Sequence, residues 1–135
     1  MKTILKSVAT FLEDNDGAIS IESVLWLPVY TFFLVMIVDV SLMFNGQAQA
    51  QRVLHDINRL ASTGYYTSEE EVESRANALL SHLSANVSVD ATIDTASGTI
   101  TAVASMPASD LMAIGTIPNF SQFNVTVGAW HLIES

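Results

Sequence analysis

The chain has 135 residues, of which half are hydrophobic and only 14% are charged, and its formal net charge is −9. About 25% charged residues is usual in a soluble domain, so this composition indicates a segment made for lipid or for a partner surface. An acidic chain without a basic cluster is a poor binder of nucleic acid, because such binding requires phosphate neutralisation. The absence of cysteine excludes a disulfide framework and thiolate chemistry. The length leaves room for one domain with an appendage.

The longest apolar run extends from Ala18 to Phe44 and is interrupted only by Glu22 and Asp39. As a helix it would span roughly 40 Å, which exceeds the hydrocarbon core of a bilayer, about 30 Å. The two acids would lie near opposite interfaces, where a charge costs less than at the bilayer centre. We therefore predict a transmembrane helix over residues 18–44. The alternative, a buried helix of a soluble protein, fits poorly because globular helices usually have about 8–20 residues.

A cleaved secretory signal is a second alternative for the same run. Lys2 and Lys6 could form its basic start, and residues 48–50 read Ala-Gln-Ala, which is an A-x-A cleavage site. Cleavage after Ala50 would release a secreted protein. Against this interpretation, the run is longer than the roughly 7–15 apolar residues of a signal peptide, and acidic residues separate it from the lysines.

A glycine immediately precedes the apolar run, and a glutamate follows this glycine five residues later: Gly17 and Glu22. Together with Phe11 before the glycine and Pro28 inside the run, this pattern resembles the TadE/TadG-like group over about residues 11–60. The proteins of this group are minor pilins, or pseudopilins, of the tight-adherence (Tad/Flp) type IV-like pilus system. The resemblance implies a structural role in pilus assembly.

The resemblance also implies that the chain is processed. A prepilin peptidase would remove residues 1–17 as a leader by cutting between Gly17 and Ala18, and Glu22 would become the fifth residue of the mature chain. The new ammonium group of Ala18, once buried in a helix bundle, needs a partner or loses its charge. Glu22 lies one turn along the helix and could pair with this amine in its own or a neighbouring subunit. The alternative is that Glu22 only reaches the lipid headgroups and has no functional role.

Localisation and partners follow from the same resemblance. The chain would be a single-pass protein of the bacterial inner membrane with its C-terminal domain in the periplasm, and it could enter an extracellular pilus. Its partners would be the membrane, other pilins, the Tad pilus assembly machinery and the prepilin peptidase, in the context of cell adhesion and bacterial secretion. Charge does not set the orientation, because two basic residues precede the helix and two follow it closely. The alternative is a membrane-anchored periplasmic binding or sensor domain.

Helical periodicity continues beyond the apolar run and predicts a stalk helix over residues 45–62. Gly64 is suited to end this helix, because glycine adopts the left-handed conformation of a helix C-terminus without strain. The expected apolar face of the stalk comprises Val53, Ile57, Leu60 and Ala61.

Residues 63–135 are predicted to form a small α+β domain outside the cytoplasm. Ser68 and Glu71 form a capping box that starts a helix running to about Leu83. The apolar stripe of this helix comprises Val72, Ala76, Leu79, Leu80 and Leu83. So small a domain without disulfides buries little apolar area, so we expect the stalk helix or partner pilins to stabilise it.

The rest of this domain has the period of two that is typical of strands. Apolar and polar residues alternate from Val87 to Asp94, residues 95–98 form a turn, and a second strand returns as far as Met106. A final strand is expected from Phe123 to Leu132. The fold class is therefore α+β, with about three antiparallel strands.

Patterns that carry chemistry are missing from the sequence. His55, His82 and His131 lack the spacing of metal ligands, and there is no Gly-rich phosphate loop and no G-x-S-x-G elbow. We therefore predict no catalytic residue, no metal, no cofactor and no small-molecule substrate. The acidic cluster at residues 69–73 could be a docking surface, although a solvated helix start is the commoner explanation.

Overall fold

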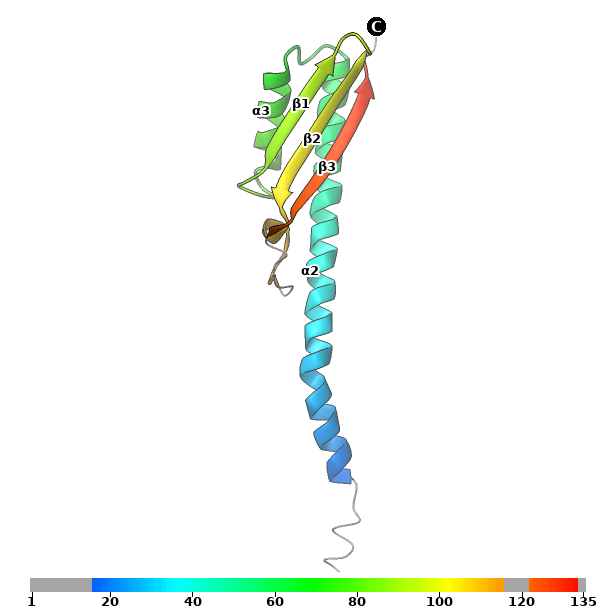
Figure 1. Cartoon of the computed structure of the whole chain (residues 1–135), viewed down its shortest axis with the longest axis vertical. Coiled ribbons are helices and arrows are strands. Elements are labelled where there is room, and N and C mark those ends of the chain that lie inside the picture. The colour runs from blue at the N-terminus through cyan, green and yellow to red at the C-terminus, as the bar shows by residue number, and fades with distance from the viewer. Residues whose placement is uncertain (1–15, 116–121, 134–135) are drawn as a thin grey trace, which may run out of the picture. The chain divides into compact units, whose positions relative to one another are not determined.

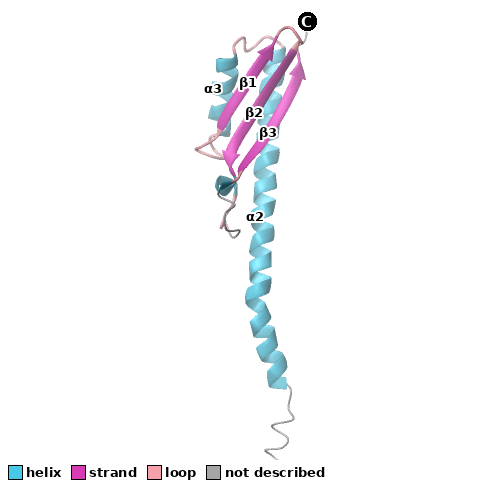
Figure 2. Cartoon of the chain, viewed as in Figure 1, coloured by secondary structure: helices cyan, strands magenta, loops and turns pink. Residues whose placement is uncertain are grey.

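The structure is a computed structural model, and it describes residues 16–115 and 122–133. These residues have the α+β fold that the sequence predicts (Figures 1 and 2). In chain order the elements are α2 (Asp16–Ser62), α3 (Glu69–Leu80), β1 (Ser88–Asp94), β2 (Thr99–Pro107), the short 3-10 helix η1 (Ala108–Leu111) and β3 (Asn124–Leu132). The chain divides into two compact units, one ending at Val35 and one beginning at Met36, and α2 contributes to both.

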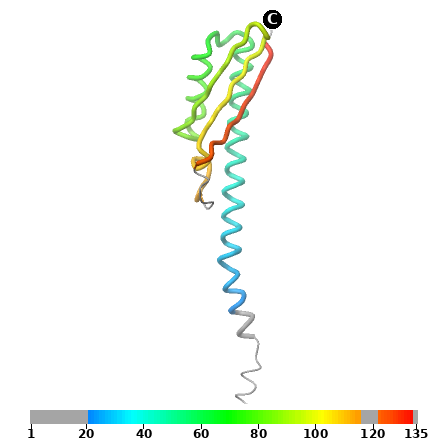
Figure 3. Tube along the Cα trace, in the orientation of Figure 1, coloured from blue at the N-terminus to red at the C-terminus, as the bar shows by residue number. Residues whose placement is uncertain are grey.

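The three strands form one antiparallel sheet in the order β1-β2-β3, so that β2 is central (Figure 3). The hairpin between β1 and β2 turns at the predicted residues. There the Asp94 carboxylate accepts hydrogen bonds from the backbone N–H groups of Ala96 and Ser97. Gly98 completes the turn at a φ of 66°, where a side chain would be strained. The predicted hairpin is therefore confirmed.

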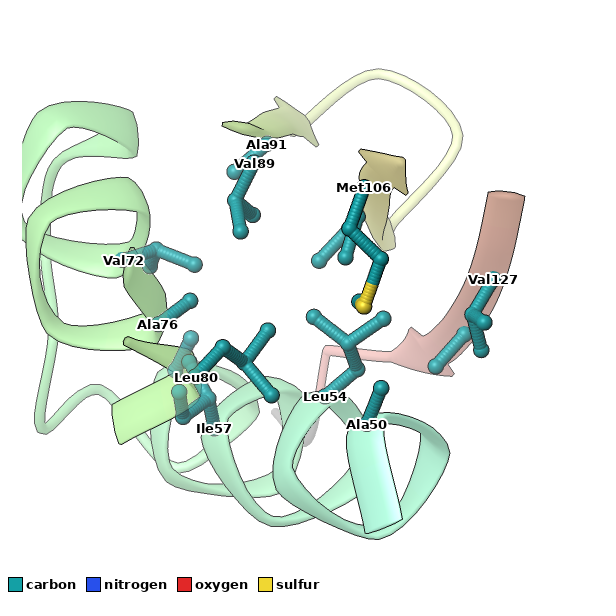
Figure 4. Close-up of a cluster of buried hydrophobic side chains, with 14 of the residues drawn as sticks. Ala50, Leu54, Ile57, Val72, Ala76, Leu80, Val89, Ala91, Met106 and Val127 are labelled. Carbon is teal, nitrogen blue, oxygen red and sulfur yellow. The ribbon is translucent and has the colours of Figure 1, made fainter. Parts of the chain in front are cut away.

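Helices α2 and α3 pack against one face of the sheet, and the core lies between them (Figure 4). Along β1, Val89 and Ala91 are buried, whereas Asp90 and Thr92 are exposed, as a period of two requires. The buried residues of the sheet include four alanines: Ala91, Ala102, Ala104 and Ala129. Side chains this small allow the helices and the strands to approach closely.

The face that α2 turns toward the sheet differs by one residue step from the predicted face. Ile57 and Ala61 are buried as expected, but Leu60 is 42% exposed and Leu54 is fully buried in its place. Since Leu54, Ile57 and Ala61 follow the i, i+3, i+7 spacing of one helix face, Leu60 necessarily points away from it. The prediction for Leu60 was wrong because the sequence offered two adjacent apolar faces and only the sheet selects one.

The end of α2 and the start of α3 lie where the local sequence predicts them, whereas the end of α3 does not. Gly64 follows α2 with a φ of 80°, and Ser68 caps α3 by accepting a hydrogen bond from the Glu71 N–H. However, α3 ends at Leu80, three residues before the predicted Leu83. The chain turns after Leu80 because Ser84 is buried there and donates a hydrogen bond to Asp110 of η1. This long-range contact accounts for the early end of α3.

Leu54 and Leu60 provide a matched test of this packing, because they lie on the same helix and differ in burial. We expect Leu54→Ala to lower the free energy of unfolding by about 2–5 kcal/mol, because it leaves a cavity in the core. Leu60→Ala should change it by less than about 0.5 kcal/mol, as surface substitutions do. Hydrogen exchange of the β2 amides in mild detergent measures both values, and equal effects would contradict the assigned face.

Candidate functional site: the apolar part of helix α2 and a buried aspartate

The N-terminal part of α2 exposes large apolar side chains all around the helix. The exposed ones are Ile21, Val24, Leu25, Trp26, Leu27, Val29, Tyr30, Phe32, Phe33, Leu34, Ile37, Val38, Leu42 and Phe44. This helix is long and apolar enough to cross a membrane. A surface so apolar is typical of a helix that faces lipid or partner helices.

Two hydroxyl groups inside this run, those of Thr31 and Ser41, are satisfied within the helix itself. Thr31 Oγ1 donates a hydrogen bond to the Leu27 carbonyl at 2.9 Å, and Ser41 Oγ donates to the Ile37 carbonyl at 2.8 Å. Because a buried hydroxyl without a partner is costly in an apolar medium, this pattern suits a helix surrounded by lipid or by other helices.

The predicted processing and pairing residues lie at the start of α2. Gly17 and Ala18 belong to its first turn, and Glu22 follows one turn later. Glu22, Trp26 and Tyr30 are four residues apart, so they share one helix face and line a shallow groove. The Trp26 and Tyr30 rings lie 6.1 Å apart. This face presents a carboxylate and two aromatic rings, and the pairing of Glu22 with an amine stays a prediction.

Asp39 has a more specific environment than the sequence indicates. Its side chain is fully buried, and its Oδ1 accepts hydrogen bonds from the backbone N–H groups of Ala113 and Ile114, both at 3.1 Å. These two hydrogen bonds satisfy a buried acceptor oxygen that would be costly without a partner. The carboxylate of Asp39 therefore fixes the loop after η1 to α2. We call this pair of hydrogen bonds the Asp39 clamp.

A second contact fixes η1 itself to α2. A Cβ atom at Gly46 would lie 2.7 Å from Leu111 Cδ2, so the close approach of Leu111 depends on a glycine at this position. Asp39, Gly46 and Ala50 are all buried and continue the helix face that packs on the sheet. Neither contact was predicted from the sequence, although the i, i+7, i+11 spacing of Asp39, Gly46 and Ala50 was a signal for them.

Asp110 links η1 to the segment that follows α3. Its carboxylate accepts hydrogen bonds from Ser84 Oγ at 2.5 Å and from Asn86 Nδ2 at 3.3 Å. The hydrogen bond from Ser84 is the main cause that lowers the pKa of Asp110 below its ordinary value of 3.8. These bonds place η1 between α2 and the end of α3.

Two carboxylates of the acidic cluster bind the edge strand β1. The Glu73 carboxylate accepts a hydrogen bond from the Ala91 N–H at 2.9 Å, and the Glu69 carboxylate accepts one from the Ile93 N–H at 2.8 Å. An uncovered strand edge can pair with another chain, so these glutamates protect β1 from such pairing. The sequence suggested a docking surface or a solvated helix start for this cluster and missed this role.

The histidines do not gather into a site. Of the three histidines, only His55 and His131 are in ring contact within the described residues 16–115 and 122–133, with their ring centroids 6.0 Å apart. The same residues hold no group of three or more His, Asp or Glu side chains arranged to bind a metal.

The link between Ser84 and Asp110 can be tested by titration. Because its folded-state pKa is lowered, the Asp110 carboxylate favours folding above about pH 3.8 and loses this contribution as the pH falls through the folded-state pKa. We expect Ser84→Ala to raise the pKa of Asp110, measured by NMR titration of the side-chain carboxyl signal. Asp94, whose pKa is lowered mainly by Ser97, is the internal control and should not respond. An unchanged Asp110 titration would contradict the assigned cause.

Comparison with known proteins identifies the segment that contains these features. Residues 17–57 match the family model of TadE-like proteins, which confirms the resemblance over that part of the chain. TadE-like pilus proteins are structural and are not enzymes. The match covers Gly17, Glu22, the exposed apolar residues of α2 and Asp39. No curated protein and no solved structure matches the chain.

Proposed function

We propose that this chain, with its TadE-like segment at residues 17–57, is a minor pilin or pseudopilin that assembles into or with a Tad pilus. The observation that carries the proposal is the coincidence of this match, which begins at Gly17, with an exposed apolar helix that contains Glu22. Helix α2 anchors the chain in the bacterial inner membrane, and the domain after it lies in the periplasm. Tad pilus proteins are then its partners in assembly.

Processing by a prepilin peptidase is part of this proposal. The bond between Gly17 and Ala18 lies in the first turn of α2, and the ends of a helix open at the lowest free-energy cost. A peptidase in the membrane can therefore reach this bond without unfolding the rest of the helix. Cleavage removes residues 1–17 and leaves Ala18 as the N-terminus.

Glu22 is proposed to pair with the ammonium group of Ala18 in a neighbouring subunit. The exposed face of Glu22, Trp26 and Tyr30 supports a helix–helix contact at this point. Inside a bundle of apolar helices, the carboxylate and the ammonium would each be costly alone and would stabilise each other as a pair. The same pair would also fix the axial position of one helix against the next.

The alternatives differ from this proposal in the N-terminus of the mature chain. Ala18 supports the pilin, Met1 supports an unprocessed sensor or binding domain, and Gln51 supports a secreted protein. The burial of Ala50 argues against the last of these, because cleavage after it would remove a residue of the core together with Gly46. N-terminal sequencing of the protein from a strain with a Tad system separates all three.

We expect Gly17→Ala to block cleavage, because a residue with a Cβ atom before the cut bond should not fit a site that accepts glycine. Co-expression with a prepilin peptidase, followed by mass spectrometry of the product, measures this. Ser20→Ala is a matched control, since it changes a small residue beyond the bond and should be cut like the wild type. A wild-type chain that stays uncut would contradict the processing step.

We expect Glu22→Gln to insert into the membrane and to be cut after Gly17, but to lose crosslinking to other pilins and pilus formation. Truncating one partner of a buried ion pair typically costs about 3–5 kcal/mol, and this cost would appear in association only. Glu70→Gln, the same change at an exposed position of α3, serves as the control. Pili at wild-type levels in the Glu22→Gln strain would show that Glu22 only reaches the headgroups.

A further inference from the structure

We propose that the loop after η1, residues 112–114, lies at the surface of the lipid bilayer and that Asp39 holds it there. The partner of this surface is the bilayer itself, at the boundary between its headgroups and its hydrocarbon. The inference rests on the membrane anchoring proposed above and adds which part of the folded domain meets the membrane. It assigns Asp39 the role of setting that depth.

The hydrogen bonds of Asp39 limit where this residue can lie relative to the bilayer. Its carboxylate binds the N–H groups of Ala113 and Ile114, so the carboxylate and this loop share one level along α2. The residues from Ala113 to Gly115 are exposed and are not helical. Non-helical backbone that faces lipid does not occur inside the hydrocarbon, because its polar groups would lack partners. The hydrocarbon must therefore end before Asp39.

The part of α2 that precedes Asp39 has the length of a membrane span. From Ala18 to Val38, α2 spans about 32 Å at 1.5 Å per residue, close to the roughly 30 Å of a hydrocarbon core. Continuing the span to Phe44 would give about 40 Å and would place Asp39 inside the lipid. The clamp thus ends the apolar span where the thickness of a bilayer requires it to end.

The side chains near Asp39 are suited to the surface of a bilayer. Ile114 is 66% exposed although its N–H is bound to Asp39, so an apolar side chain is presented at the height of the interface. The headgroup layer is roughly 5–7 Å thick, which corresponds to the next few residues of α2. There Leu42 and Phe44 are also exposed, and aromatic residues are typical of this layer.

The charges nearby agree with this placement. Leu111 packs on Gly46, which is about 10 Å farther along α2 than Asp39. The exposed carboxylate of Asp110 is next to Leu111, so it lies beyond the headgroups, where water solvates it. The carboxylate that lies at the boundary, that of Asp39, is covered by protein and bound by two N–H groups.

The chain contains no cysteine, so a single introduced cysteine can carry an environment-sensitive fluorophore at one defined position. We choose Ile114→Cys in the loop, Leu34→Cys in the apolar part of α2 and Ala96→Cys in the β1–β2 turn. The full chain is reconstituted in vesicles of phosphatidylcholine and phosphatidylglycerol. Quenching by nitroxides at the headgroup and deep in the acyl chains, and by iodide in water, reports the depth of each label.

We expect the label at position 34 to be quenched by the deep nitroxide, that at 114 by the headgroup nitroxide, and that at 96 by iodide only. If position 34 is accessible to iodide, the proposed membrane anchor itself fails. If position 34 is deep but position 114 behaves like position 96, the anchor stands and this inference is overturned. A label at 114 as deep as that at 34 would overturn it as well.

Substitution of Asp39 then tests the clamp. In the Ile114→Cys chain, Asp39→Ala removes the acceptor, so headgroup quenching of the label should fall to the level of position 96 while position 34 stays deep. Asp39→Asn retains a carbonyl oxygen that can accept the same N–H bonds and should keep most of the quenching. Unchanged quenching in Asp39→Ala would show that the loop does not depend on Asp39.

Discussion

The apolar face of a three-stranded sheet has to be covered, and the cover that α2 provides is the contact on which the domain depends. Ala50, Leu54, Ile57 and Ala61 of α2 belong to the same buried cluster as Val72 of α3 and the inner face of the sheet. A sheet of three strands reaches independent stability only with a packed hydrophobic face. From Ala50 to Ala61, α2 is therefore part of the domain's core and is more than a tether.

The small residues of the sheet make this cover close enough to be specific. With alanines at positions such as Ala102 and Ala129, a side chain of the helix can reach the backbone of a strand. Asn58 does so, because its Nδ2 donates a hydrogen bond to the Ala129 carbonyl at 2.8 Å in a fully buried position. A buried polar contact of this kind is costly when misplaced, so it favours one position of α2 on the sheet.

The features that the sequence predicted correctly are those that local rules determine. The hairpin follows from alternation and a turn at residues 95–98, the start of α3 from the Ser68 cap, and the end of α2 from Gly64. The features that it missed depend on partners far along the chain. The sequence did not favour Leu54 over Leu60, because contact with the sheet determines which of them is buried. It did not predict the early end of α3, because that end depends on the contact with η1.

The candidate site divides in the same way. The Gly17 and Glu22 spacing and the apolar run are local patterns, and the family match covers both. The hydrogen bonds of Glu69 and Glu73 to the edge of β1 join residues 18 to 24 positions apart, and no local pattern contains that information. The acidic cluster was interpreted as a solvated helix start because its hydrogen-bond donors are backbone N–H groups of a strand edge. Backbone groups are present at every residue, so the sequence does not show where such donors lie.

Asp39 and Gly46 show why the boundary of the apolar run was the hardest feature to predict. An aspartate is expensive in lipid and a glycine is unfavourable inside a helix, so both look like interruptions of a membrane span. In the fold they are contacts, since Asp39 binds the loop after η1 and Gly46 receives Leu111. Before them α2 is apolar all around, and after them it has one buried face. These two residues therefore mark where α2 stops being apolar all around and begins to face its own domain.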